Sequence, residues 1–136
     1  MPNTVMLGEV TRMLESGCDV TLAAKGHSML PSIRGGRDSV RLKRADLYEV
    51  GDVVLAKISE GIYVMHRITS IGEYVTLKGD GNLRQTERCQ EADIAGKVVA
   101  IVKANGDERR VPRGRVWHAM PLWLRRILLG LYKRII

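Results

Sequence analysis

Apolar and polar positions follow two different periods along this chain, and the first stretch has the period of a helix. Over residues 3–16, apolar side chains recur every three or four positions, which predicts an amphipathic helix. Asn3 or Thr4 is suited to cap its start, and Gly17 is suited to end it. The apolar positions are Met6, Leu7, Val10, Met13 and Leu14. Because five apolar side chains on one face need burial, we expect this face to pack against the core.

Between residues 19 and 102 the pattern changes to short runs that are typical of strands, separated by glycines. The predicted strands cover 20–24, 39–42, 53–58, 62–68, 74–77 and 94–102. Glu60-Gly61 has the features of a tight hairpin between the third and fourth of them. Because no helical segment interrupts this region, we expect no parallel βαβ units. The predicted fold class is mainly β, a small coiled antiparallel sheet or a partly open barrel.

The last part of the chain predicts a basic amphipathic helix. Residues 105–114 are polar, and Pro112 and Pro121 prevent one continuous helix through this region. After Pro121 one helical face carries Leu124, Ile127, Leu128, Leu131 and Ile135, and the other side carries Arg125, Arg126, Lys133 and Arg134. We therefore divide the chain into a β domain with its N-terminal helix, residues 1–112, and a basic helical tail, residues 113–136.

The net charge of +7 is concentrated in this tail. From Arg113 onward there are six Lys or Arg residues and no acidic residue, which leaves 16 basic against 15 acidic residues elsewhere. The chain has no Phe, and its aromatic residues make up only 4%. A nearly neutral body with few aromatic side chains argues against a nucleic-acid partner.

The sequence also limits the compartment and the cofactors. No apolar run approaches the ~20 residues of a membrane-spanning helix. Glu9, Arg12 and Glu15 interrupt the N-terminal apolar positions, so no secretory signal is expected there. We expect a cytoplasmic chain whose two cysteines, Cys18 and Cys89, remain reduced. No cluster with the spacing of metal ligands is present, and neither a metal nor another cofactor is expected.

Three residues stand out as candidates for chemistry. Ser28 follows a predicted strand on a turn, where its hydroxyl can project, although turn serines are also common as structural residues. His66 lies in an alternating apolar strand; imidazole suits proton transfer at neutral pH, and the alternative is a packed core histidine. Asp80 lies between two glycines after a strand, where an Asx turn is the alternative role.

Taken in order, these segments resemble the signal peptidases and the self-cleaving, LexA-like repressor peptidases. The segments are Gly26-His27-Ser28-Met29-Leu30-Pro31, Gly36-Arg37-Asp38, Val50-Gly51-Asp52-Val53-Val54, His66-Arg67-Ile68 and Lys78-Gly79-Asp80-Gly81-Asn82. The segments that begin at Gly26 and Gly36 are similar to the nucleophile box G/S-x-S-M-x-P with its following G-D, and the segment that begins at Val50 is similar to the G-D-I-V strand entry. His66-Arg67-Ile68 falls where bacterial enzymes have a general-base lysine, and it is similar to the H-R-V of archaeal and endoplasmic-reticulum enzymes. The segment that begins at Lys78 is similar to K-G-D-N-N. The likeness covers about residues 22–101.

This resemblance implies a serine endopeptidase. Ser28 would be the nucleophile, its backbone N–H would serve the oxyanion hole, and His66 would be the general base and later the general acid. Asp80 would orient the imidazole, with Glu87 as the rival for that role. Many relatives have a hydroxyl two residues before the nucleophile, where this chain has Gly26; slow turnover or a narrow substrate range is expected as a result.

The expected partner is an extended polypeptide that binds as an added strand beside the nucleophile. A catalytically weak peptide-binding or assembly module on the same fold is the alternative function. Two interpretations of the helix over 121–136 stay open: contact with an anionic membrane surface, or packing against the sheet or another subunit. His27, expected as an exposed turn residue, and His118, in the tail, are not expected to take part in catalysis.

Overall fold

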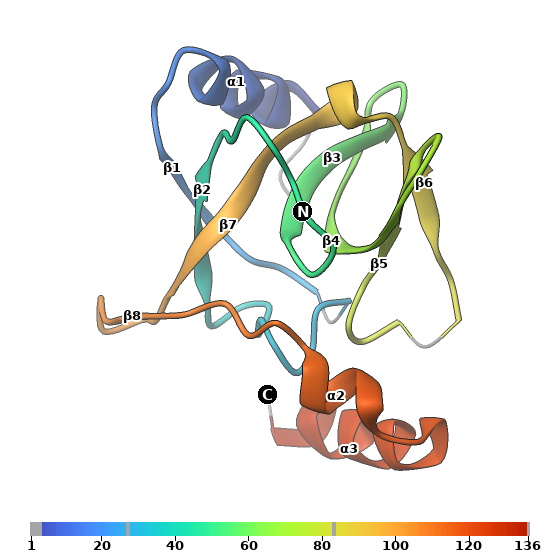
Figure 1. Cartoon of the computed structure of the whole chain (residues 1–136). Helices are drawn as coiled ribbons and strands as arrows, with labels where there is room; N and C mark the ends of the chain where they lie inside the picture. Colours follow the sequence, from blue (N-terminus) through green and yellow to red (C-terminus); the bar gives the residue numbers. More distant parts are fainter. Residues whose placement is uncertain (1–3, 27, 83, 136) are drawn as a thin grey trace.

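The computed structural model describes residues 4–26, 28–82 and 84–135. Within these residues, eight strands form one antiparallel sheet in the order β1-β2-β7-β3-β4-β5-β6, with β8 pairing to β7. The strands are β1 (Val20–Ala23), β2 (Ser39–Lys43), β3 (Val53–Ser59), β4 (Ile62–Ile71), β5 (Val75–Lys78), β6 (Glu87–Cys89), β7 (Ile94–Val102) and β8 (Glu108–Arg109). The helical elements are α1 (Thr4–Glu15), the 3₁₀ turn η1 (Glu91–Asp93), α2 (Arg115–Ala119) and α3 (Leu122–Ile135). The sheet coils without closing (Figure 1), which confirms the predicted mainly β fold.

All six predicted strands are present, and their ends shift by a few residues. The hairpin at Glu60-Gly61 is confirmed: β3 and β4 pair directly, and Gly61 has the positive φ of 75° that such a turn favours. The sequence missed β6, β8 and α2. These elements have between two and five residues, too few to display a period in the sequence.

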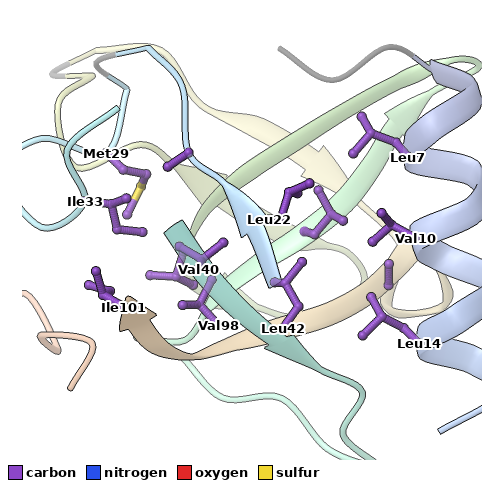
Figure 2. Packing of buried hydrophobic residues seen from close by; sticks show 14 residues of the cluster. Leu7, Val10, Leu14, Leu22, Met29, Ile33, Val40, Leu42, Val98 and Ile101 are labelled. Atoms are coloured by element: carbon purple, nitrogen blue, oxygen red, sulfur yellow. The ribbon is translucent and has the colours of Figure 1, made fainter. Parts of the chain in front are cut away.

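Helix α1 packs against the sheet through one side of its predicted apolar face. Leu7, Val10 and Leu14 are buried in the largest hydrophobic cluster (Figure 2), but Met13 is 46% exposed, and the side chain of Met6 lies outside the described residues. The cluster comprises Leu7, Val10, Leu14, Leu22, Ala24, Met29, Ile33, Val40, Leu42, Val53, Leu55, Ala95, Val98 and Ile101. At φ 93°, Gly17 ends the helix as predicted. The candidate cap Asn3 lies outside the described residues.

Strand β3 divides the core between two clusters. Its residues Val53 and Leu55 belong to the first cluster, whereas Val54 and Ala56 belong to a second one. The second cluster contains Val54, Ala56, Ile68, Val75, Leu77, Cys89 and Ile94. Because successive side chains of a strand point to opposite faces, β3 is covered on both sides. Strand β4, which carries His66, pairs along its length with this doubly covered strand β3, so the backbone of His66 lies in a rigid part of the sheet.

The tail docks onto the body at the opposite end of the molecule from α1 (Figure 1). Trp117 of α2 and Leu129 of α3 form a small buried cluster with Leu30, so the tail packs on a loop next to Ser28. The indole N–H of Trp117 also donates to the backbone carbonyl of Asp80 at 2.8 Å. Leu129, the buried residue of α3, does not belong to the predicted apolar face. Of that face, Leu128 packs partly buried against the small cluster, whereas Ile127 and Leu131 remain about half exposed, so the helix docks on a side different from the predicted one.

Candidate active site

Ser28 lies in a loop, described over residues 24–26 and 28–38, whose two ends are in contact; this segment is called the Ser28 loop below. The N–H of Gly36 donates to the carbonyl of Ala24 at 2.9 Å. A β-carbon on Gly35 would lie only 2.0 Å from the carbonyl oxygen of Gly26, so only glycine permits this close approach. Gly26 itself has a φ of 78°, in the left-handed region. The loop thereby leaves Ser28 exposed.

The Ser28 loop rests on the turn after β5, which holds Gly79 to Asn82. The N–H of Gly81 donates to the carbonyl of Ser28 at 2.8 Å. A β-carbon on Gly79 would lie 2.3 Å from that carbonyl oxygen and 3.1 Å from Nε2 of His66. The backbone carbonyl of Ser28 and the imidazole of His66 therefore both lie close to the position that a Gly79 side chain would occupy. Because glycine has no side chain, there is room for both of them.

His66 extends from β4 toward Gly79 with Nε2, and Glu87 holds the other ring nitrogen, Nδ1. Nδ1 of His66 and Oε1 of Glu87 are 2.5 Å apart, and both side chains are about nine-tenths buried. The strand register explains the pairing. Ile68 faces Leu77 and Leu77 faces Glu87, so His66, two residues before Ile68, shares this face of the sheet with Glu87. With Nδ1 engaged, Nε2 is the nitrogen on the side of Ser28.

Ser28 and His66 line the same cleft. The other lining residues are Leu7, Leu22, Ala23, Ala24, Lys25, Gly26, Met29, Ile33, Gly35, Leu55, Tyr63, Val64 and Met65, so its walls are mainly apolar. Within the described part of the chain, no hydrogen bond joins Ser28 Oγ to His66 Nε2. The two side chains predicted to act together are thus gathered in one cleft without being joined, as is common in active sites without substrate.

Asp80 has a different set of partners, and its expected contact with His66 is wrong. Nε and Nη2 of Arg67 donate to its two carboxylate oxygens at 2.8 and 2.7 Å, and the hydroxyl of Ser32 donates to it at 2.5 Å. His118 Nε2 lies 3.1 Å from Oδ1. Since strand alternation sends the side chains of His66 and Arg67 to opposite faces, a carboxylate that binds Arg67 is on the wrong face for His66.

The charge of Asp80 is strongly favoured by these partners. Burial alone raises the pKa of this carboxyl group, but the hydrogen bonds from Arg67, His118 and Ser32, with the charge of Arg67, outweigh burial and lower the pKa to about 2. Nη1 of Arg67 also donates to the carbonyls of Gly51 and Pro112, each at 2.8 Å. The Asp80–Arg67 pair therefore ties the turn after β5 to Gly51 and to Pro112, the last residue before the tail.

Sequence reasoning found some of these residues and missed others. Glu87 was only the rival orienter, because the three-residue strand that places it shows no alternating pattern. Ser32 and Arg67 were not singled out, although the H-R pair in β4 was a signal that two faces of the strand were in use. His118, expected to have no part in the site, contacts Asp80, and His27 lies outside the described residues.

The described residues offer neither a cluster for a metal ion nor a helix that could span a membrane. Over the described residues, no group of three or more His, Cys, Asp or Glu side chains could hold a metal ion. None of the helices found in those residues is long and apolar enough to cross a membrane. No protein-family model matches the chain, and no curated protein matches it significantly.

Proposed function

We propose that this protein is a serine endopeptidase similar to signal peptidases, with Ser28 as nucleophile and His66 as general base. The observation that carries this proposal is the position of His66. Its Nε2 and the backbone of Ser28 both adjoin Gly79, while its Nδ1 is held by the carboxylate of Glu87. A nucleophile, a base and a carboxylate that orients the base make up the arrangement of a serine hydrolase.

The proposed reaction begins when Nε2 of His66 takes the proton of Ser28 Oγ as the oxygen attacks the scissile carbonyl. Glu87 stabilises the imidazolium that forms and fixes the ring so that Nε2 faces the hydroxyl. The N–H of Ser28 stabilises the oxyanion of the tetrahedral intermediate. Nε2 then protonates the leaving amine, which breaks the peptide bond. A water molecule, activated by the same nitrogen, hydrolyses the acyl-enzyme. Asp80 has no proton-transfer role in this scheme; it holds the turn on which the Ser28 loop rests.

The substrate of this proposal is an extended peptide with apolar side chains. β1 is at one end of the strand order, and the segment from its last paired residue, Ala23, to Gly26 lines the cleft. An extended chain can therefore pair with this edge and place its side chains against apolar walls. The backbone hydrogen bonds would bring the scissile carbonyl to Ser28.

A fluorophosphonate probe tests this proposal directly, because it reacts with activated serines. We expect labelling of the wild-type protein, none in Ser28→Ala and at least about 100-fold slower labelling in His66→Ala, since general bases contribute about 10²–10⁴-fold. Ser70→Ala is the matched control, because Ser70 is an exposed serine of β4 away from the cleft. Labelling that survives in Ser28→Ala, or that is equal in His66→Ala, would remove these residues from the mechanism.

A catalytically weak peptide-binding module is the second candidate. It is favoured by Gly26, which offers no hydroxyl as a second oxyanion donor, and by the absence of a direct Ser28–His66 hydrogen bond among the described residues. In this case the wild-type protein binds extended apolar peptides but is not labelled, and Ser28→Ala leaves peptide affinity unchanged. Measuring labelling and peptide affinity on the same preparation separates the two functions.

Peripheral membrane contact through α3 is part of the proposal. Trp123, Ile127 and Leu131 are 63%, 55% and 48% exposed and, spaced four residues apart, form one outward stripe beside Arg134. A Trp-containing apolar stripe next to a cation suits the anionic lipids of the cytoplasmic leaflet.

Vesicle sedimentation tests this contact. We expect binding to vesicles with anionic lipid and weaker binding to neutral ones, with a loss in Ile127→Ser. Leu47→Ser is the control, because Leu47 is 78% exposed but belongs to the body. Equal sedimentation of both variants would contradict membrane contact through α3.

A further inference from the structure

A second hollow borders Ser28 on the side where α3 docks. It lies between the turn after β5 and α3, and of the residues that the structure describes, Ser28 alone lines both cavities. The lining residues are Ser28, Gly81, Asn82, Arg84, Arg126, Leu129, Gly130 and Lys133. We call this cavity the basic hollow, because three of these eight residues are cations and none is acidic.

The three cations of the basic hollow have no counter-charge among the described residues. Within the described residues, Arg84, Arg126 and Lys133 form no ion pair with a carboxylate and no side-chain hydrogen bond. Arg67, by contrast, is fully paired with Asp80. Like charges that face one cavity repel each other and raise the local potential, so an anion that enters the hollow gains from all three.

The docking of the tail is what brings these cations to Ser28. Leu129 is 4% exposed and packs with Trp117 and Leu30, which fixes the rotation of α3 on the body. Arg126 and Lys133 lie on either side of Leu129, three and four residues away, and so share its face of the helix. Gly130, with no atom within 4 Å of its β-carbon position, leaves the space between them open.

We infer that the basic hollow binds an acidic side chain of the substrate, located on the opposite side of the scissile bond from the apolar segment. This inference rests on the proposed function, because it requires the peptide to cross Ser28. An extended chain advances about 3.3 Å per residue, so a carboxylate a few residues beyond the cut reaches the hollow. Guanidinium and ammonium groups form charge-assisted hydrogen bonds with carboxylates. The substrate class is thus a peptide that is apolar on one side of the cut and acidic on the other.

A lipid phosphate is the other anion that three cations could hold, and the geometry favours the peptide. The apolar stripe Trp123, Ile127 and Leu131, which would enter a membrane, occupies a different face of α3 from Arg126 and Lys133. The hollow also opens beside the nucleophile, where a substrate has to pass.

Peptide binding to the full-length Ser28→Ala protein tests the inference without any catalytic step. The probes are fluorescein-labelled ten-residue peptides with an apolar Ala/Val half and a half that carries either three Glu or three Gln, made in both orders of the two halves. Fluorescence anisotropy measures their affinity. In one order, we expect the Glu peptide to bind about tenfold more tightly than its Gln counterpart, since several exposed ion pairs each add modestly, and high salt should remove the difference.

The variants Arg126→Glu and Lys133→Glu should abolish this preference for Glu. Arg134→Glu, with the same change of charge on the same helix but outside the hollow, should keep it. Equal affinity for the Glu and Gln peptides, or equal loss in all three variants, would overturn the inference. So would competition by vesicles with anionic lipid that depends on Arg126 and Lys133, because it would assign the hollow to a lipid headgroup.

Failure of the proposed function gives a different result. If the fluorophosphonate probe does not label Ser28 while the Glu preference persists, the hydrolase is wrong and the acidic-peptide site stands. If the probe labels Ser28 but the Glu and Gln peptides bind equally, the hydrolase stands and the inference about the basic hollow is wrong.

Discussion

His66 and Arg67 are adjacent in β4, but their side chains bind different carboxylates: His66 pairs with Glu87, and Arg67 pairs with Asp80. The imidazole lies on the face of Glu87, and the guanidinium lies on the face of Asp80. Glu87 therefore orients the general base of the proposed reaction, whereas Asp80 stabilises the turn that supports Ser28. Substitutions at these two carboxylates should consequently have separable effects on reactivity and on stability.

Glu87→Gln should reduce reactivity while it preserves the fold. The amide has the size of the carboxylate, but it cannot stabilise an imidazolium as a charge does. The labelling rate of Ser28 should fall about 100-fold or more; the corresponding acid-to-amide change in a Ser-His-Asp triad costs about 10⁴. The urea midpoint should change little. Glu91→Gln, in the exposed turn η1, is the control. A wild-type labelling rate in Glu87→Gln would exclude Glu87 from the mechanism.

Asp80→Asn should destabilise the protein and change its response to acid. The pKa of Asp80 is about 2 in the folded protein against 3.8 ordinarily, so its charge stabilises the fold by about 2 kcal/mol above pH 3.8. Because the folded pKa is depressed, this contribution is lost as the pH falls through about 2. The variant lacks it at every pH and leaves Arg67 buried without a counter-charge, at a cost of about 3–5 kcal/mol.

Urea unfolding of both proteins between pH 6 and pH 2 measures this effect. The difference in the free energy of unfolding between wild type and Asp80→Asn should shrink toward the acid end. Asp46→Asn, at an exposed position, should follow the wild type throughout. A difference that stays constant with pH would mean that the charge of Asp80 does not stabilise the fold.

At the scale of elements, alternation and glycine spacing were sufficient to predict six strands and the β3–β4 hairpin, and the helical period of apolar residues was sufficient to predict α1 and α3. By strand alternation Val64 and Ile68 share one face of β4, and both pack with the second cluster. The partner of His66 was harder to predict because it depends on pairing across three strands. The strand that supplies Glu87 has three residues, and only its register with β5 reveals which face it occupies.

The contact between the Ser28 loop and the turn after β5 depends on Gly79, and Gly79→Ala should disrupt it. The new methyl carbon would lie 2.3 Å from the carbonyl oxygen of Ser28, so the backbone of one segment must move. We expect a loss of about 1–3 kcal/mol in the free energy of unfolding, as for other overpacked sites, and slower labelling of Ser28. Gly72→Ala is the matched control, because nothing lies within 4 Å of its β-carbon position. Equal labelling of both variants would show that this close approach is unimportant.

At the scale of the whole molecule, the tail behaves as part of the site although the sequence sets it apart. The charge pattern divides the chain at residue 113, yet side-chain contacts cross that division. The indole of Trp117 donates to the carbonyl of Asp80, His118 contacts its carboxylate, and Arg113 donates to the carboxylate of Asp52. A tail joined to the turn beneath the Ser28 loop can influence the nucleophile as well as form the basic hollow.

Trp117→Ala should therefore lower both the free energy of unfolding of the protein and the labelling rate of Ser28. Removal of a buried Trp side chain typically costs about 3–5 kcal/mol, and this one also loses its hydrogen bond to Asp80. Hydrogen exchange should show lower protection in α2, α3 and residues 79–82, and Ser28 should be labelled more slowly. Trp123→Ala is the control, because its indole is 63% exposed and should change stability by less than about 0.5 kcal/mol while it weakens vesicle binding. If Trp117→Ala releases only the helices and leaves residues 79–82 protected and Ser28 fully reactive, the tail is an appendage whose docking does not support the site.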